Sequence, residues 1–344
     1  MTDEFVADSE VEEEELYEHY KFKADPGQVI IRIDKFLIDR VPNTSRNKIQ
    51  CSAKNGNIHV NGKSVKQNYK VKPGDEIAIV LPYPVREITL IPQDIPIEIA
   101  YEDDDLLVVN KPSNMVVHPG YGNYKDTLVN ALVFHIDNLP KPPADYFGRP
   151  GLVHRIDKHT TGLLVVAKTE MALTHLAKQF YDRTTERLYY ALVWGDIKEP
   201  GTITGNIGRS LKNRKVMTVF PNGDYGKHAI THYKVIENFG LVTLVQCKLE
   251  TGRTHQIRAH FQHIGHPLFN DLEYGGNKIV RGTVSALYKR FIENCFELIP
   301  GQALHAKTLG FMQPTTKKML RFDSVLPASF TELLDRWRKY SVTN

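Results

Sequence analysis

Ionisable side chains crowd together between two apolar runs near the middle of the chain. The segment from residue 151 to 168 reads G-L-V-H-R-I-D-K-H-T-T-G-L-L-V-V-A-K, and four such side chains stand close together in it: His154, Arg155, Asp157 and Lys158. Residues 151–153 and 163–167 are short, apolar and bounded by Gly or polar turns, so we expect two buried strands with Asp157 at a sheet edge. A carboxylate there can act as nucleophile or general base. A merely solvated turn has the same local pattern, so other segments must decide between the two readings.

A second charged segment, from residue 249 to 267, contains G-R-T-H-Q-I-R-A-H. We expect a strand that ends at Gly252 and a helix over residues 254–264, which places Arg253 at the junction. The segment also holds four histidines: His255, His260, His263 and His266. Their spacing matches no metal site, and no thiolate is near. We therefore interpret them as structural or hydrogen-bonding residues and expect no metal.

The surrounding pattern predicts the fold class. Short strands follow one another over residues 189–194, 230–236 and 241–249, while Thr169 can cap an amphipathic helix. No internal repeat and no regular alternation of strand and helix is present. We expect an α+β domain with a mixed, largely antiparallel sheet and flanking helices.

Composition limits the classes of function. The 344 residues are 41% hydrophobic and 24% charged, as in ordinary globular proteins, and no apolar stretch approaches the length of a membrane span. Three scattered cysteines indicate neither a disulfide framework nor a thiolate metal site, which favours a cytoplasmic location. Residues 1–20 hold nine acids and no Lys or Arg, so residues 21–344 carry a net charge of +13. A body with that excess favours polyanionic partners.

The first folded region is expected to be a small basic module. Residues 32–40 and 45–56 have the spacing of two short helices, with Ser45 as an N-cap and Gly56 as a stop, and Asn61-Gly62 predicts a hairpin before a strand at 77–80. Together these features resemble the alpha-L RNA-binding module first known from a small-subunit ribosomal protein. The resemblance implies RNA contacts from its cations, among them Arg32, Lys35, Arg46, Lys48 and Lys63. An inert basic domain is the alternative.

Four motifs beyond residue 95 resemble the RluA/RluD-type RNA pseudouridine synthases. They are H-R-I-D-K-H-T-T-G-L-L-V-V-A-K around Asp157, R-L-Y-Y-A-L-V-W-G from Arg187, G-R-T-H-Q-I-R-A-H from Gly252 and L-H-A-K-T-L-G-F from Leu304. They stand in the family's order, and an alpha-L module often precedes this domain in the family. Arg187 is a mild departure, since Lys is frequent at that position.

The resemblance implies roles for particular residues. Asp157 matches the catalytic aspartate, Arg253 the arginine that pairs with it and keeps it ionised, and Tyr189 the tyrosine against the uracil ring. Arg155 matches the side chain that fills the gap left by a flipped uridine. We also expect His154 and Ile257 to contact substrate, although Ile257 suits a core position equally well. The Lys/Arg-rich stretch 209–215 is expected to bind phosphates.

The predicted protein is thus an RNA pseudouridine synthase that needs no metal or organic cofactor and acts on large-subunit ribosomal RNA as a cytoplasmic monomer without a membrane partner. A transfer-RNA-directed synthase and a non-catalytic RNA-binding ribosome assembly factor are the alternatives. We expect an acidic disordered tail over 1–20, the alpha-L domain over 21–80, a Pro-rich linker over 81–95 and the catalytic domain over 96–344. Whether Asp157 attacks the sugar, attacks the base or abstracts a sugar proton stays open.

Overall fold

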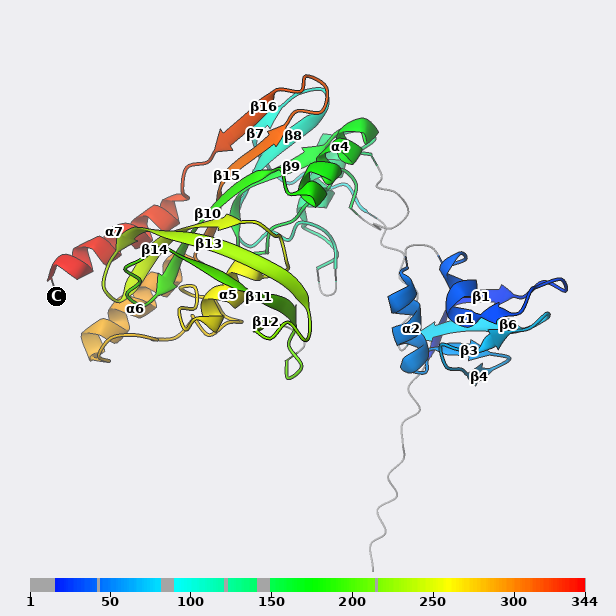
Figure 1. Cartoon of the computed structure of the whole chain (residues 1–344). Coiled ribbons are helices and arrows are strands. Elements are labelled where there is room, and N and C mark those ends of the chain that lie inside the picture. The colour runs from blue at the N-terminus through cyan, green and yellow to red at the C-terminus, as the bar shows by residue number, and fades with distance from the viewer. Residues whose placement is uncertain are drawn as a thin grey trace, which may run out of the picture. The chain divides into compact units, whose positions relative to one another are not determined.

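The chain folds into two compact units, described here from a computed structural model that covers residues 16–41, 44–81, 90–120, 123–140, 149–213 and 216–343 (Figure 1). The first unit holds the described residues up to 81 and the second those from 90 onward. β1 (Tyr17–Lys23) pairs with β6 (Glu76–Leu81), so the predicted tail over 1–20 is wrong for residues 17–20, which belong to a sheet. Residues 1–15 of that tail, and most of the predicted linker, lie outside the described residues.

The first unit has the predicted two helices and hairpin. α1 (Ile33–Ile38) is followed by α2 (Arg46–Lys54), where the Ser45 side chain caps the helix by accepting a hydrogen bond from the Lys48 N–H. β3 (Ile58–Val60) and β4 (Lys63–Ser64) form the hairpin, and both turn residues, Asn61 and Gly62, have positive φ as its tight turn requires. β1, β6, β3 and β4 make one sheet, and β2 (Ile31–Arg32) pairs with β5 (Lys70–Val71).

A ten-stranded sheet organises the second unit. Its strands are ordered β12-β11-β13-β14-β10-β15-β9-β8-β7, with β16 added beside β15. Their bounds are as follows: β7 (Glu98–Glu102), β8 (Leu106–Lys111), β9 (Thr161–Ala167), β10 (Glu186–Trp194), β11 (Gly201–Arg209), β12 (Met217–Phe220), β13 (Lys227–Asn238), β14 (Val242–Leu249), β15 (Leu304–Met312) and β16 (Met319–Asp323). Among the described pairings of this sheet only β9 with β15 is parallel, so the predicted mixed, largely antiparallel α+β fold is confirmed.

Helices cover both faces of this sheet (Figure 1). Alternate residues of β10 show the division: Tyr189, Ala191 and Val193 belong to the core with α3 (Leu128–His135) and α5 (Gln256–His263), and Leu192 and Trp194 belong to the core with α6 (Ala286–Leu298) and α7 (Ala328–Thr343). α4 (Glu170–Asp182) packs on β9 and β15 after the predicted cap at Thr169. A strand buried on both faces holds its side chains rigidly, and Tyr189 is therefore fixed in place.

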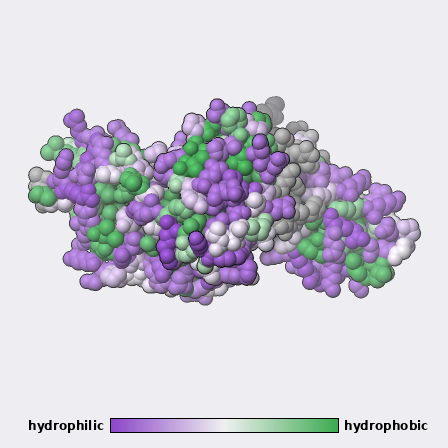
Figure 2. Space-filling model, turned by 90° about the horizontal axis from the view of Figure 1, so that it is seen from above, coloured by the Kyte–Doolittle hydropathy of each residue, from purple (hydrophilic) through white to green (hydrophobic). Residues whose placement is uncertain are grey.

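The surface of both units is mostly hydrophilic on the face that Figure 2 shows, with apolar residues in small separate patches. None of the described helices combines the length and apolarity that a membrane span requires.

Residues 151–153 are not the strand that the sequence predicts, because only Leu152 forms a bridge, to Val166. The Gly151 carbonyl accepts the Ala167 N–H instead, so this segment closes over the end of β9 as a turn.

Gly162 makes the contact between β9 and β15 possible. Its φ is +104°, and a Cβ at this position would lie 2.3 Å from the Ala306 carbonyl oxygen. Gly162→Ala is expected to destabilise the protein by roughly 3–5 kcal/mol, because backbone atoms rather than a flexible side chain stand in the way. Gly240→Ala is the matched control, since Gly240 also has positive φ (+80°) but no atom within 4 Å. The control isolates the cost of the backbone conformation, about 1–2 kcal/mol. Urea unfolding of the two variants measures the difference, and equal losses would contradict the steric explanation.

Candidate active site

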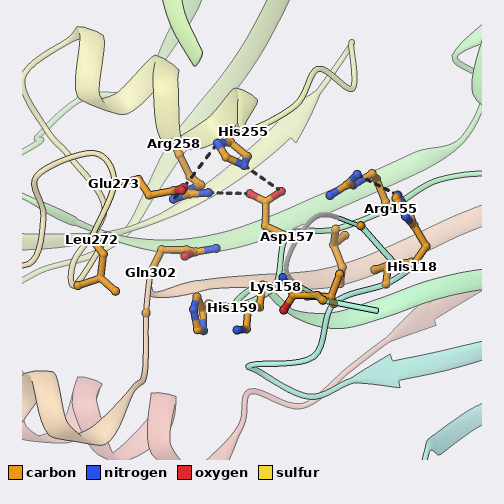
Figure 3. A pocket seen from close by; sticks show the side chains of 16 residues that line it. His118, Arg155, Asp157, Lys158, His159, His255, Arg258, Leu272, Glu273 and Gln302 are labelled. Carbon is orange, nitrogen blue, oxygen red and sulfur yellow. Dashed lines mark hydrogen bonds and ion pairs between the residues drawn. The ribbon is translucent and has the colours of Figure 1, made fainter. Parts of the chain in front are cut away.

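Asp157 lies at the wall of a cavity of about 390 Å³, within the size range of ~300–1,000 Å³ typical of ligand sites (Figure 3). Four segments line the cavity: the turn after β8, the loop before β9, the segments around α5 and the residues just before β15. Its lining includes His118, Arg155, Asp157, His159, His255, Arg258, Glu273 and Gln302. Figure 3 shows the Asp157 carboxylate between Arg258 and His255 on one side and Arg155 on the other.

The loop that carries Asp157 is fastened to its neighbours along its length. The His154 ring accepts the Val165 N–H through Nε2 at 3.0 Å and stacks on Phe180 at 4.4 Å between ring centroids. The Thr160 N–H donates to the Asp157 carbonyl at 3.1 Å. Burial lowers the pKa of His154 to about 3, so its ring is neutral and can accept that bond. His154 is absent from the cavity lining and holds the loop in this structure, while its predicted contact with substrate stays a prediction.

Lys111, at the end of β8, also anchors the loop that carries Asp157. Its side chain is 1% exposed, and Nζ donates to the carbonyls of Pro112, Met115 and Lys158 at 2.7, 2.9 and 3.0 Å. Burial lowers the pKa of Lys111 to about 7, and the negative charge of Asp157 opposes this. Three carbonyl acceptors match the three N–H groups of an ammonium, so the geometry favours the charged form. One sequence feature indicates this buried role: Lys111 continues the apolar run L-L-V-V-N-K.

Arg258, not Arg253, pairs with Asp157. Arg258 Nη1 donates to Asp157 Oδ2 at 3.2 Å, whereas Arg253 Nε donates to the His228 carbonyl at 3.1 Å and makes no ion pair with a described residue. Arg253 lies before α5 and is drawn toward β13, while Arg258 lies in the first turn of α5, which faces the loop. The prediction named the wrong arginine of the motif G-R-T-H-Q-I-R, because a junction position does not determine the direction of a side chain.

Acids behind Arg258 fix its guanidinium. Asp271, fully buried, accepts from Nε at 2.7 Å and Nη2 at 2.8 Å, and Glu273 accepts from Nη2 at 2.6 Å. Burial alone would lower the pKa of Arg258, but the Asp271 hydrogen bonds raise it above its usual value. A two-point grip on a planar guanidinium fixes its orientation. The remaining Nη1 is therefore aimed at Asp157.

His255 is a further neighbour of Asp157. Its Nε2 lies 3.8 Å from Asp157 Oδ1, and its Nδ1 lies 3.0 Å from the Tyr274 hydroxyl. The residue has φ +53°, a costly conformation for a non-glycine residue that often marks functional sites. Burial lowers the pKa of His255, while the Asp157 charge raises it.

Gln256 anchors the preceding turn, since its side chain bonds Thr251, Thr231 and the Ile230 carbonyl. His260 bonds Thr231 and His266 the Trp194 carbonyl, as hydrogen-bonding histidines do.

Tyr189 and Ile257 lie behind the cavity wall. Tyr189 is 8% exposed and Ile257 4%, both in the core that also contains Phe261, and neither is among the residues that line the cavity. Ile257 thus has the core position that its helical spacing allowed, and its predicted contact with substrate stays a prediction. Burial raises the pKa of Tyr189, and the charge of Asp157 raises it further while that of Arg187 lowers it. The phenol is therefore protonated and within electrostatic reach of Asp157.

Arg155 points along the cavity from the other side of Asp157. His118 Nδ1 lies 2.8 Å from the Pro119 carbonyl, so Nδ1 carries the proton and Nε2 accepts from Arg155 Nη1 at 3.0 Å. Burial lowers the pKa of His118 to about 4, which keeps Nε2 an acceptor at neutral pH. The exposed Arg155 side chain is thereby held in one direction.

His118→Phe, which removes the acceptor but keeps a ring, is expected to lower kcat/KM about 3- to 10-fold, the value of one hydrogen bond. If His118 acts through Arg155, the loss should disappear when Arg155 is already Ala. Steady-state kinetics of the two single variants and the double variant measure this. Additive losses would show that His118 acts independently of Arg155.

The first unit contains a buried carboxylate that gathers two arginines. Asp34 is 0% exposed and accepts from Arg32 at 3.0 Å, from Arg46 at 3.1 Å and from Gln50 at 2.7 Å. Lys35, Lys48 and Lys63 are exposed. All five predicted RNA-contacting cations of this unit are thus at its surface or partly exposed. Of the predicted phosphate-binding stretch 209–215, residues 214–215 lie outside the described residues.

The hydrogen bonds to Asp34 should make the stability of the protein depend on pH in the acidic range. Burial alone would raise the pKa of Asp34, but bonds from Gln50, Arg32 and Arg46 lower it to about 2. A carboxylate with a lowered folded-state pKa contributes stability above its unfolded pKa, about 3.9, and loses it as the pH falls through about 2. Asp34→Asn is therefore expected to be less stable than the wild type at pH 5–7, with the difference shrinking between pH 4 and 2. Thermal unfolding at several pH values tests this; a pH-independent difference would contradict it.

Comparisons with known proteins identify relatives of this chain. The family model described as RNA pseudouridylate synthase matches residues 105–263, and the S4 domain model matches residues 31–77. The chain is 48% identical to an RNA pseudouridine synthase of Chlorobaculum parvum over 90% of this chain and 95% of the relative. It is 41% identical to the ribosomal large subunit pseudouridine synthase D of Zymomonas mobilis, over 86% and 90%. Human RNA Pseudouridylate Synthase Domain Containing 4 shares the fold, with a TM-score of 0.53, 23% identity and coverage of 70% of this chain and 93% of that one.

Proposed function

Because this chain belongs to the RNA pseudouridylate synthase family, we propose that it converts specific uridines of large-subunit ribosomal RNA to pseudouridine, with Asp157 as the catalytic group. The observation that carries the proposal is a carboxylate at the wall of a nucleobase-sized cavity, paired with an arginine that two further acids orient. The ribosomal target rests on relatives such as the Zymomonas mobilis protein, whose name states that substrate.

The reaction needs a nucleophile or base but no electron transfer. The bond between C1′ of the ribose and N1 of uracil breaks, the base turns, and C1′ joins C5; the hydrogen leaves C5 and N1 takes up a proton. An Asp157 oxygen in the cavity can attack carbon or remove a proton, and the structure favours neither. Arg258 fixes the carboxylate. We assign Tyr189 to support the base ring from the core beside the cavity, where burial keeps its phenol protonated.

A base inside an RNA stem or loop must leave its stack to reach Asp157. We assign Arg155 to the space that the base vacates, since it is exposed at the cavity and held by His118. The S4 domain binds the RNA backbone elsewhere through its cations, including Arg32, Lys35, Arg46, Lys48 and Lys63. Binding by many phosphate contacts should weaken steeply with added salt.

Two further properties are part of the proposal. We propose that the protein acts in the cytoplasm, which its three free cysteines suit. We also propose that it works as a monomer, because a single unit supplies the described lining of the Asp157 cavity. Size-exclusion chromatography with light scattering tests the monomer.

The decisive experiment is a pseudouridine map of ribosomal and transfer RNA from cells that lack the protein. We expect one or a few sites in large-subunit ribosomal RNA to lose pseudouridine and to regain it when the wild-type gene is restored. Loss only in transfer RNA would replace the ribosomal target with the transfer-RNA alternative. No lost site in any RNA, together with no tritium release from uridine-labelled RNA by the purified protein, would favour a non-catalytic assembly factor.

A further inference from the structure

Arg187 is a buried cation for which the described residues supply no counter-ion. The residue is 9% exposed, its Nε is shut off from solvent with no hydrogen-bond partner, and no ion pair joins it to any described residue. The guanidinium lies over the Phe180 ring, with the guanidinium carbon 5.4 Å from the ring centroid. A buried unpaired charge is strongly unfavourable, so such a group persists where a ligand supplies the opposite charge.

Its position connects it to the active site. Arg187 stands two residues before Tyr189 on β10, and alternate residues of a strand point to the same side. Gly252 approaches it from the turn that leads into α5: a Cβ there would lie 3.0 Å from Arg187 Nη1. The charge of Arg187 also acts on His154 and Tyr189. Arg187 therefore lies between the loop that carries Asp157 and the turn that leads to Arg258.

The anion must come from outside this cluster. Asp157, Asp271 and Glu273 already bind Arg258, and none of them is paired with Arg187. RNA carries one negative charge per nucleotide, and a guanidinium matches two phosphate oxygens with two N–H groups. A uracil carbonyl would satisfy a donor but not the charge.

We propose that Arg187 binds the backbone phosphate next to the flipped uridine, so that the phosphate and Asp157 together fix the ribose between them. Arg155 fills the RNA stack and Arg187 holds the extruded nucleotide. This inference rests on the proposed function, since it takes an extruded uridine as the ligand.

The test removes the charge from either partner. The substrate is an RNA hairpin around the uridine that the pseudouridine map identifies, with a single neutral methylphosphonate placed at each nearby linkage in turn. We expect one linkage at which the substitution lowers the wild-type kcat/KM about 10- to 100-fold, the value of a charge-assisted hydrogen bond. Arg187→Gln should be slower by a similar factor on unmodified RNA and should lose less than about threefold more at that linkage.

Controls separate binding from folding. Arg321→Gln removes an exposed arginine that pairs with Glu186, the neighbour of Arg187, and should leave kcat/KM and its linkage dependence unchanged. The melting temperature of Arg187→Gln should equal or exceed that of the wild type, because an uncompensated buried charge is gone. Undiminished sensitivity of Arg187→Gln at every linkage would overturn the proposal, as would a lowered melting temperature with unchanged linkage dependence, which indicates a structural role. If the wild type forms no pseudouridine in any RNA, the proposed function has failed before Arg187 is tested.

Discussion

Asp157→Asn should abolish pseudouridine formation while the protein still folds and binds RNA. The substitution keeps the size of the side chain and one oxygen acceptor for Arg258 Nη1, which lies 3.2 Å away, but it removes the nucleophilic or basic character of the carboxylate. Removal of such a group from an enzyme costs at least roughly 10⁴-fold in kcat. Tritium release from RNA labelled at C5 of uridine measures the loss directly.

Two controls make this expectation informative. RNA affinity, measured by filter binding at fixed salt, should change by less than about threefold, because one carboxylate contributes little to backbone contacts. Glu273→Gln removes another acid that binds Arg258, yet Glu273 is 42% exposed and shares Arg258 with the buried Asp271, so a smaller loss of about tenfold is expected. An active Asp157→Asn enzyme would exclude every mechanism in which this residue attacks or removes a proton.

Local patterns predicted several helices and a hairpin of both units. Ser45, Thr169 and the Asn61-Gly62 turn each act through neighbours a few residues away, and the structure confirms the helices and hairpin predicted from them. The segment 151–153 failed the same test. Its apolar composition suits a strand, but Gly151 has φ +70° and its carbonyl bonds Ala167, so the segment turns instead of extending. The apolar composition of a short segment indicates that it is buried, but a buried segment can be either a strand or a packed turn.

Long-range partners were harder to predict. The charges expected at the site are present, but which arginine reaches Asp157 depends on where α5 begins and on an acid from another segment. Asp271 binds Arg258 with two hydrogen bonds, and nothing in the spacing between the two residues indicates that contact. Lys111 and His118 were missed for the same reason: they bond the Asp157 loop from positions 47 and 37 residues earlier than their partners in the chain. The spacing of residues in a helix predicts which side chains share a face, but it does not predict which residues of a distant segment contact that face.

Arg258→Met is expected to lower kcat by at least about 100-fold and to destabilise the protein by roughly 3–5 kcal/mol, because it leaves Asp271 buried without its counter-ion. Arg253→Met should keep kcat at saturating RNA within about threefold, since Arg253 makes no ion pair with Asp157. The comparison tests which arginine of the motif serves the carboxylate. Single-turnover kinetics and urea unfolding of both variants provide the two readouts.

The loss of activity must be separated from the loss of stability. Adding Asp271→Asn to Arg258→Met removes the uncompensated buried charge, so the double variant should recover part of the lost unfolding free energy without regaining activity. Arg258→Lys retains a positive charge but cannot grip Asp271 at two points and reach Asp157 at once, so its kcat should lie between those of Met and Arg. Equal kcat for Arg258→Met and Arg253→Met, or recovered activity in the double variant, would show that Arg258 only maintains the fold and that the Asp157 carboxylate acts without an oriented guanidinium.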